Sequence, residues 1–136
     1  MTEDVFGDRA AIRELVAAYG LALDAGDIDR CVALFVPEAE FLFYGRFFAG
    51  HDGIGQMFRD APRGLHHTGV SQVDVRGDTA TARSQVLSVR AGDQHLRPAL
   101  YDDELVRAEG GWRFRRRRCQ FVTSRGLSDT PEVSSP

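Results

Sequence analysis

The period of the hydrophobic pattern changes once along the 136-residue chain, near Leu65, and this change limits the possible folds more than any other feature. Before it, apolar residues recur at spacings of three and four, which is typical of helices that bury one face. After it, apolar and polar residues alternate over four runs separated by glycine-containing turns, which is typical of strands joined as hairpins. This order predicts an α+β fold: an antiparallel sheet, curved by its own twist into a cone, with N-terminal helices on its concave face.

The first helix is predicted over residues 8–24, with Asp8 as its N-cap. Gly26 is suited to the C-cap, because glycine adopts the left-handed conformation common at that position. The apolar stripe of this helix consists of Ile12, Leu15, Val16, Tyr19 and Leu23. Asp24 lies at the edge of that stripe, where a carboxylate meets the negative end of the helix macrodipole. Asp24 is therefore either a solvent-exposed acid in a turn or a buried carboxylate with a functional role.

The second helix is predicted over residues 28–35, capped by Asp27 and ended by Pro37. A hairpin turning at Gly45 and a third short helix follow, at residues 39–50 and 51–61. Four strands are then predicted, at residues 66–75, 79–91, 96–108 and 112–123. The sequence contains no internal repeat, so we expect one domain over residues 1–136, with flexible ends at 1–7 and 124–136.

The composition excludes several classes of function. A net charge of −3 provides no general attraction to nucleic acid or to an anionic membrane, and no apolar run approaches the ~20 residues of a membrane helix. All 17 basic residues are arginine, which excludes Schiff-base chemistry at a lysine and a phosphate-binding P-loop. The acidic N-terminus resembles no export signal, so a cytoplasmic location is expected. Cys31 and Cys119 lack zinc-site spacing and are expected to be buried thiols; no metal or cofactor is implied.

Four strings carry a resemblance to a known family: "AIRELVAAYGLALDAGDIDRCVALFVPEAEF", "GLHHTGVSQVDVRGDTATARS", "YDDELVR" and "GWRFRRR". Together they resemble the SnoaL-like branch of the nuclear-transport-factor-2-like superfamily over residues 8–121. The resemblance implies a cone-shaped sheet with a helix-lined pocket, and a homodimer formed through the outer sheet face. The superfamily includes dehydratases, isomerases, polyketide cyclases, a dehydrochlorinase and non-catalytic subunits, so the fold alone does not assign a reaction.

The resemblance also implies a catalytic set. Scytalone-dehydratase-like and dehydrochlorinase-like members place an aspartate on Asp24 and a histidine on His66. His67 remains an alternative, because a bulge would reverse the faces of that strand. Tyr19 matches an oxyanion-binding tyrosine of ketosteroid-isomerase-like members, and Tyr44 falls near a pocket tyrosine of the dehydratase. An imidazole oriented by a carboxylate can remove a proton next to a carbonyl, which is why such a pair is suited to this chemistry.

Two positions depart from the family pattern. Phe43 stands where ketosteroid-isomerase-like members keep their general-base aspartate, which argues against that mechanism. Val70 stands where the branch commonly has asparagine, which removes one polar group from the pocket. The expected substrate-binding residues are aromatic or basic: His67, Phe41, Phe43, Phe58, Tyr101 and Arg117.

The arginine run at residues 113–118 is expected to pair with acidic side chains rather than with nucleic acid. A strand period of two places Arg113, Arg115 and Arg117 on one face, and Trp112, Phe114, Arg116 and Arg118 on the other. Asp103 is a candidate for an ion pair with an arginine across strands. Arg117 also matches the tryptophan-to-arginine spacing usual in the branch.

These observations predict a cofactor-free lyase or isomerase, such as a dehydratase, cyclase or double-bond isomerase, acting on a hydrophobic polycyclic or polyketide-like molecule. The alternative is a non-catalytic ligand-binding or subunit-assembly module of the same fold. A third hypothesis, epoxide hydrolysis, would use Asp103 and an inward arginine as part of an Asp-Arg-Asp set. The first two differ in one observable: whether Asp24 and a histidine meet inside a cavity.

Overall fold

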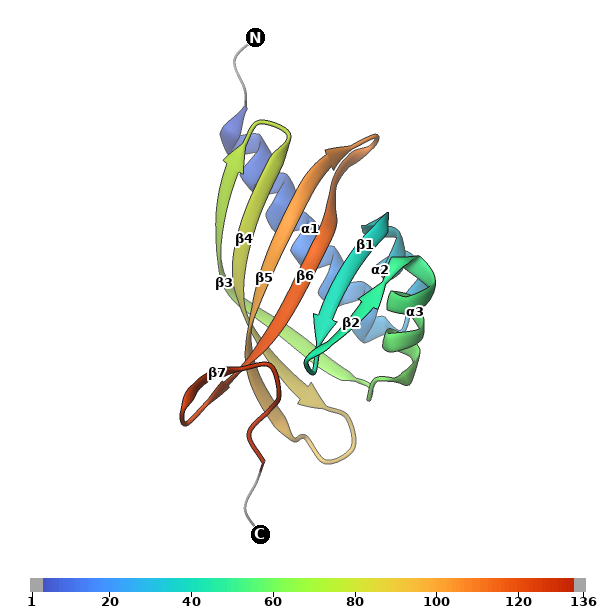
Figure 1. Ribbon diagram of the computed structural model, residues 1–136, viewed down its shortest axis with the longest axis vertical. Helices are drawn as coiled ribbons and strands as arrows, with labels where there is room; N and C mark the ends of the chain where they lie inside the picture. Colours follow the sequence, from blue (N-terminus) through green and yellow to red (C-terminus); the bar gives the residue numbers. More distant parts are fainter. Residues whose placement is uncertain (1–3, 134–136) are drawn as a thin grey trace.

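Within residues 4–133, seven strands form one curved, open sheet, and three helices cover its concave side (Figure 1). The computed structural model describes residues 4–133. The strand order across the sheet is β2-β1-β6-β5-β4-β3, with the short β7 paired to β6. All pairs are antiparallel except β1 with β6, which run parallel. The predicted α+β class is confirmed, although the sheet is mixed and contains this one parallel pair.

Helix α1 (Val5–Ala25) crosses the concave side of the sheet and lies behind it in Figure 1. Its N-cap is Asp4, whose carboxylate accepts a hydrogen bond from the backbone N–H of Gly7. The prediction of Asp8 as the cap is wrong, because the helix begins earlier and leaves Asp8 inside its first turn. The predicted apolar stripe is confirmed, since Ile12, Leu15, Val16 and Tyr19 are buried.

Helix α2 (Ile28–Ala33) begins at the predicted cap Asp27 but ends earlier than predicted. Phe35 already belongs to β1 (Phe35–Phe43), so Pro37 lies inside a strand instead of ending a helix. The pairing of β1 with β6 is irregular between Phe35 and Glu40, which is where a residue without a backbone N–H is tolerated. After the turn at Gly45 come β2 (Arg46–Ala49) and α3 (Gly50–Asp60).

The four long strands match the prediction closely. They are β3 (Gly64–Arg76), β4 (Thr79–Arg90), β5 (Leu96–Ala108) and β6 (Gly111–Thr123). The sequence did not predict β7 (Gly126–Ser128), which pairs back onto β6. Of the two ends expected to be flexible, residues 1–3 and 134–136 lie outside the described residues.

A bulge in β6 changes which arginines face inward. The register slips between Glu104 and Leu105, so that Leu105 pairs with Phe114 while Glu104 pairs with Arg116. Phe114 and Arg117 are consequently both buried on the concave side. The predicted alternation, which placed them on opposite faces, is wrong because one extra residue reverses the strand period.

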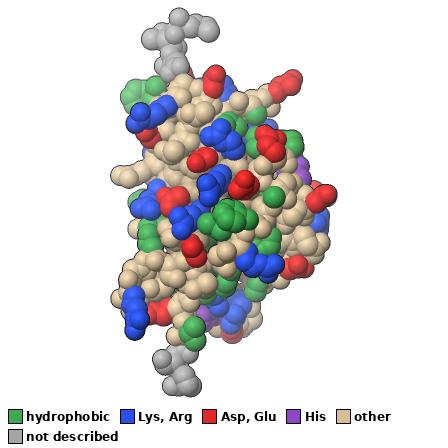
Figure 2. Space-filling view, viewed as in Figure 1, with side chains coloured by type: hydrophobic (Ala, Val, Ile, Leu, Met, Phe, Trp, Pro, Cys, Tyr) green, Lys and Arg blue, Asp and Glu red, His purple; other side chains and the backbone are tan. Residues whose placement is uncertain are grey.

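The core beneath the helices is an aromatic cluster. Its rings belong to α1, β1, α3 and β6, with centroid separations of 5.0–6.5 Å among Tyr19, Phe35, Phe41, Phe58 and Phe114. Edge-to-face arrangements predominate around Tyr19, as the ring quadrupoles favour. The outer face of the sheet differs in character, since arginine and acidic side chains are interspersed over it (Figure 2).

Candidate functional site

Asp24 and His66 meet where the end of α1 passes the beginning of β3. The Asp24 Oδ1 atom lies 2.7 Å from His66 Nδ1, and Oδ2 accepts a hydrogen bond of 2.9 Å from the backbone N–H of His66. Their side chains are 16% and 19% exposed, respectively. The double contact fixes the position of the strand and the orientation of the imidazole ring. Nε2, the other ring nitrogen, makes no contact with the carboxylate.

Small residues allow this approach. A Cβ placed on Gly20 would lie 3.4 Å from the backbone oxygen of His66, so glycine lets α1 run close to β3. Gly26 ends α1 with a φ of 79° and lies against the guanidinium of Arg63. Arg63 donates to the Asp24 backbone carbonyl at 3.3 Å. It therefore supplies a positive charge at a helix end whose last turn has no basic residue of its own.

His66 lines two adjoining cavities of about 100 and 40 Å³. Both are also lined by Phe43, Arg63 and Tyr101. The first cavity extends towards the end of the sheet and has these further residues in its wall: Tyr44, Val86, Arg90, Arg97, Ala99, Cys119 and Phe121. The second extends under the helices and is further lined by Tyr19, Phe41, Met57 and Phe58. The imidazole thus stands at the junction of two small, mostly apolar spaces.

Most of the residues predicted from the sequence line these cavities, but Asp24, His67 and Arg117 do not. Tyr19, Phe41, Phe58 and Tyr101 are buried in the walls, and Phe43 lies between the two spaces. His67 is exposed and lines neither cavity. Its prediction as a pocket residue is wrong, because neighbouring residues of β3 point to opposite faces and His66 takes the inner one.

Tyr44 occupies a strained turn at the edge of the first cavity. Its backbone φ is 55°, an uncommon conformation for a residue with a side chain, and the side chain is partly exposed. The hydroxyl accepts a hydrogen bond from Arg97, and the ring packs edge-on against Phe43 and Phe121. The tyrosine is therefore held at the rim rather than beside His66 in the interior.

Arg117 lies behind the cavity walls instead of on them. Its guanidinium carbon is 4.1 Å from the ring centroid of Tyr19 and 4.4 Å from that of Tyr101. Its Nε is 3.0 Å from Asp103 Oδ1, which confirms the ion pair predicted for Asp103. The expected direct contact between Arg117 and a ligand is corrected, since Arg117 is 1% exposed and lines neither cavity.

This buried pair is incompletely hydrogen-bonded. Neither Asp103 oxygen, nor Nε or Nη1 of Arg117, has a hydrogen-bond partner of good geometry within residues 4–133. Burial raises the pKa of Asp103 to about 6, and Arg117 offsets only part of that effect. For Arg117, burial is the largest effect and favours the neutral form, but Asp103, Tyr19, Tyr101 and Cys31 together outweigh it and raise the pKa. The arginine remains a cation next to two aromatic rings.

Burial also raises the pKa of Tyr19 and of Tyr101 well above the usual value, while the positive charge of Arg117 opposes the shift. Tyr19 and Tyr101 are therefore neutral phenols that can donate a hydrogen bond. Burial raises the pKa of the Cys119 thiol to about 12, which keeps it protonated and a poor nucleophile.

Sequence reasoning missed Arg63 and Arg97. Both line the first cavity, and each lies near a predicted site residue in space. The available signal for Arg63 was its position three residues before His66, in the loop that leads into β3. Arg97 had no comparable signal, because only the pairing of β5 brings it to Tyr44.

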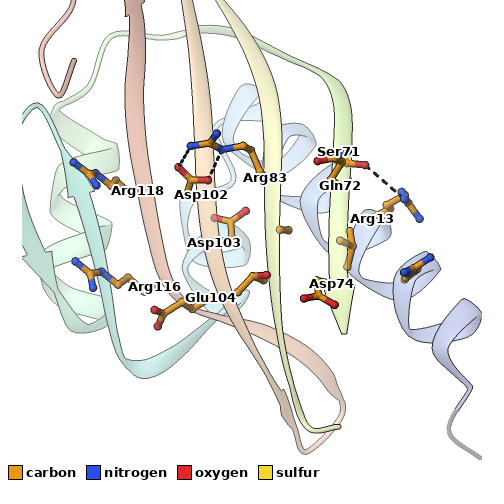
Figure 3. A pocket seen from close by; sticks show the side chains of 14 residues that line it. Arg13, Ser71, Gln72, Asp74, Arg83, Asp102, Asp103, Glu104, Arg116 and Arg118 are labelled. Carbon is orange, nitrogen blue, oxygen red and sulfur yellow. Dashed lines mark hydrogen bonds and ion pairs between the residues drawn. The ribbon is translucent and has the colours of Figure 1, made fainter. Parts of the chain in front are cut away.

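A hollow larger than these two cavities lies elsewhere on the molecule. A groove of about 790 Å³ crosses the outer face of β3–β6 and reaches the edge of α1 (Figure 3). Among its arginines, Arg83 makes a double contact with Asp102, and most of the lining side chains are polar. The groove brings together neither a histidine nor a tyrosine, so the smaller cavities around His66 remain the candidate site.

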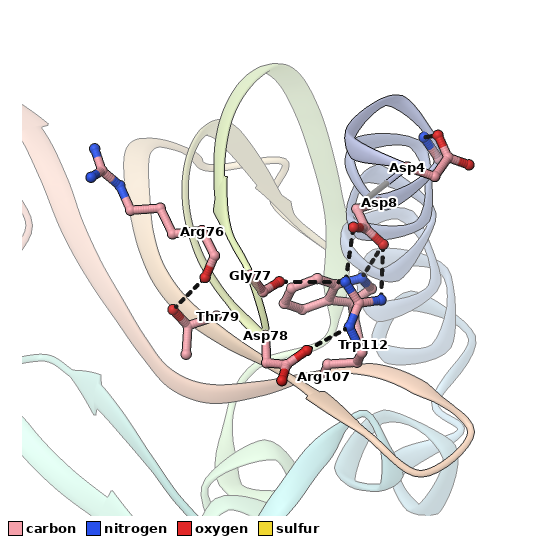
Figure 4. A network of polar contacts seen from close by, with 9 residues as sticks. Asp4, Asp8, Arg76, Gly77, Asp78, Thr79, Arg107 and Trp112 are labelled. Atoms are coloured by element: carbon pink, nitrogen blue, oxygen red, sulfur yellow. Dashed lines mark hydrogen bonds and ion pairs between the residues drawn. The ribbon is translucent and has the colours of Figure 1, made fainter. Parts of the chain in front are cut away.

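A second polar cluster ties the far end of α1 to the sheet (Figure 4). Arg107 binds both carboxylate oxygens of Asp8, at 2.8 and 2.9 Å, and contacts Asp78 at 3.1 Å. The indole N–H of Trp112 donates to Asp8 at 3.2 Å. The hydrogen bond from Arg107 lowers the pKa of Asp8. This cluster holds the start of α1 in place, at the end opposite to Asp24.

Two further findings concern residues 4–133. Within this range, no three His, Cys, Asp or Glu side chains gather closely enough to hold a metal ion. None of the helices in the same range combines the length and hydrophobicity that a membrane crossing requires.

Comparison with known proteins assigns the family. The model of the SnoaL-like domain matches residues 5–118. The chain belongs to the SnoaL-like family. The uncharacterized protein Rv2910c of Mycobacterium tuberculosis is 36% identical over 123 residues, which cover 81% of this chain and 82% of that protein. The resemblance identified from the four sequence strings is confirmed.

Solved structures share the fold of this SnoaL-like chain. An NTF2-like protein with a cystatin-like fold from Novosphingobium aromaticivorans superposes with a TM-score of 0.80 at 28% identity, covering 88% of this chain and 85% of that one. A candidate scytalone dehydratase from the same species gives 0.81 at 23% identity, over 99% and 95% of the chains. The hexachlorocyclohexane dehydrochlorinase LinA-type3 of Novosphingobium barchaimii gives 0.75 at 19%, over 96% and 97%. At 23% and 19% identity, the similarity to these last two structures shows only that the fold is shared.

Proposed function

We propose that this SnoaL-like protein is a lyase or isomerase that removes a proton next to a carbonyl group of a small hydrophobic molecule. One observation carries the proposal: Nδ1 of His66 lies 2.7 Å from the Asp24 carboxylate, while the ring lines two apolar cavities. A carboxylate at Nδ1 selects the tautomer whose Nε2 can accept a proton, and it stabilises the imidazolium that results.

The proposed reaction begins at Nε2 of His66, which takes the proton from the carbon next to the carbonyl. The electron pair of the broken C–H bond moves to the carbonyl oxygen and gives an enolate-like intermediate. In a dehydration, these electrons then form a carbon–carbon double bond, and the β-hydroxyl leaves with the imidazolium proton as water. In an isomerisation, the same proton returns to a different carbon. In a cyclisation, the enolate carbon attacks a second carbonyl, whose oxygen takes the proton.

The neighbouring phenols support the intermediate in this proposal. Tyr19 lines the second cavity and Tyr101 lines both, and each is a neutral hydrogen-bond donor because burial raises its pKa. The guanidinium of Arg117, 4.1 and 4.4 Å from their rings, makes the phenols more acidic and hence better donors to a developing oxyanion. In this proposal Arg117 is a positioning residue that acts through the tyrosines.

The cavity volumes favour a small substrate. The two spaces, of about 100 and 40 Å³, fall below the roughly 300–1,000 Å³ of typical ligand pockets. A compound with one or two rings therefore suits the cavities better than the larger polycyclic molecules expected from the sequence. A larger substrate would need the segment between α3 and β3, which contains Arg63, to move outward.

The proposal is tested by hydrogen exchange, which detects proton removal even before the natural product is identified. Cyclic β-hydroxyketones and β,γ-unsaturated ketones are incubated in D₂O with the wild type, His66→Gln and His67→Gln. We expect the wild type to exchange the α-hydrogen, and His66→Gln to lose roughly 10²-fold or more of that rate. His67→Gln is the matched control and should behave as the wild type, because its side chain lies on the outer face.

Two outcomes would count against this function. Equal losses in the two histidine variants would indicate a general structural effect. Saturable binding of these ketones without any exchange by the wild type would favour the alternative, a non-catalytic ligand-binding module.

A further inference from the structure

The rim of the first cavity has an excess of positive charge. Three arginines line it, namely Arg63 before β3, Arg90 at the end of β4 and Arg97 at the start of β5. In the part of the chain that the structure describes, no aspartate or glutamate lines this cavity or the second one. Since the chain as a whole has a net charge of −3, this excess is a local reversal of the overall charge.

Among residues 4–133, a carboxylate neutralises only one of these arginines. Arg90 pairs with Asp93 in the β4–β5 turn. Within residues 4–133, neither Arg63 nor Arg97 has a carboxylate within salt-bridge distance. Arg63 donates to a backbone carbonyl at 3.3 Å, and Arg97 donates to the hydroxyl of Tyr44. Two guanidinium groups at the rim therefore retain donors and an uncompensated charge.

The wall beneath these arginines is apolar. It is formed by Phe43, Val86, Ala99 and Phe121, and it leads to His66. A ligand that matches this arrangement has an apolar ring for the interior and an anionic group for the rim. A carboxylate suits the rim best, because the planar guanidinium binds its two oxygens with parallel hydrogen bonds.

We infer that the substrate is a hydrophobic carboxylate, whose carboxyl group is bound by Arg63 and Arg97 while its ring extends towards His66. The inference rests on the proposed function for the role of His66, and it adds the chemical class of the substrate. Binding the carboxylate at the rim fixes the distance of the apolar part from the imidazole. It also directs anions to one opening of an otherwise acidic protein.

Arg63 has a second role that must be separated from ligand binding. Its contact with the Asp24 carbonyl compensates the end of α1, so its replacement affects the helix as well. Arg97 makes no such contact with a helix end. The two arginines are therefore tested individually, and a pair of ligands that differ only in charge is compared on each protein.

The experiment measures the affinities of 3-phenylpropanoate and its neutral isostere 3-phenylpropanamide by NMR titration of the full chain. We expect the wild type to bind the carboxylate at least about tenfold more tightly than the amide, as one charge-assisted pair provides. Arg97→Gln and Arg63→Gln should each reduce this preference, and the double variant should abolish it. Arg125→Gln is the matched control, because this exposed arginine lines neither cavity. It should keep the preference.

Several results would overturn the inference. The inference fails if the wild type binds the two ligands with equal affinity, or shows saturable binding of neither. It also fails if the preference for the carboxylate survives in the double variant, or if Arg125→Gln loses as much of that preference as the cavity variants do. The result for His66→Gln separates this inference from the proposed function. That variant should retain the carboxylate preference although it has lost proton removal. If the wild type shows no preference for the carboxylate but still exchanges the α-hydrogen, only the substrate class is contradicted.

Discussion

The Asp24 carboxylate holds both the ring and the backbone of His66, through Oδ1 to Nδ1 at 2.7 Å and Oδ2 to the backbone N–H at 2.9 Å. Residues 42 positions apart are thereby locked in one orientation at the wall of two cavities. The arrangement explains why a carboxylate is tolerated at the negative end of α1. The carboxylate accepts hydrogen bonds from two N–H groups of His66 in β3. Arg63 compensates the negative charge of the helix end by donating to the Asp24 carbonyl.

Replacing Asp24 by asparagine tests the orientation of the imidazole. An amide nitrogen facing Nδ1 would favour the opposite tautomer, in which Nε2 carries the proton and cannot act as a base. We expect proton removal to slow by about 10²–10⁴-fold with little change in substrate affinity. The turnover number and KM are measured together, and ¹⁵N NMR of the ring reports the tautomer. An unaltered tautomer with unaltered turnover would contradict the role of Asp24.

The buried Asp103 predicts an unusual dependence of stability on pH. Its folded-state pKa of about 6 lies above the usual 3.8, so the folded protein binds this proton more tightly than the unfolded chain does. The contribution of Asp103 to the free energy of unfolding is therefore complete below about pH 3.8 and is lost as the pH rises through 6. Relative to Asp103→Asn, the wild type should lose on the order of 1–3 kcal/mol between pH 4 and 7.

Urea denaturation of both proteins at several pH values measures this difference. A difference that grows in favour of the wild type as the pH rises would show that attraction to Arg117 outweighs the cost of burial. In that case the carboxylate would be ionised throughout the range.

Arg117 and Asp103 should be strongly coupled in stability. Arg117→Met leaves a buried carboxylate without its counter-ion, and we expect it to reduce the free energy of unfolding by about 3–5 kcal/mol. The double variant Arg117→Met/Asp103→Leu should recover most of that loss, because it removes both charges from the interior. Denaturation of the two single variants and the double variant gives the coupling energy.

The same double variant separates stability from catalysis. If Arg117 acts through Tyr19 and Tyr101, proton removal should remain slow although the fold is restored. Recovery of the wild-type rate together with stability would limit Arg117 to a structural role.

Gly26→Ala should affect both the helix end and the rim of the cavity. Gly26 has a φ of 79°, and a Cβ there would lie 2.9 Å from Nη2 of Arg63. We expect a loss of about 1–2 kcal/mol from the backbone alone, and a displaced Arg63 that weakens carboxylate binding. Gly92→Ala is the control, since its φ is 95° but nothing lies within 4 Å of the added atom. Thermal melts should show similar losses in both variants, whereas ligand titration should detect an effect only at position 26.

The sequence determined the elements themselves with few errors. Periodicity placed the apolar stripe of α1 and the four long strands, since a helix with one buried face and a half-buried strand each have a characteristic repeat. Its errors occurred where local signals compete. Pro37 indicates the end of a helix, yet it lies in the unpaired part of β1. Asp8 resembles an N-cap, yet its carboxylate accepts a hydrogen bond from Arg107.

The sequence also indicated Asp24 and His66, but only through the resemblance to a family. It left His67 as an alternative and gave no sign of Arg97, because strand parity and cross-strand pairing depend on bulges and register.

What the tertiary structure alone decided is which side chains share a cavity. A single bulge turned Arg117 inward beneath Tyr19 and Tyr101, and the pairing of β4 with β5 brought Arg97 to the rim. Local propensity determines the period of each helix or strand. The packing and register of distant segments determine its phase, that is, which of its side chains face the cavities. The positions of Arg117 and Arg97 depend on this phase, and for that reason only the folded chain shows them.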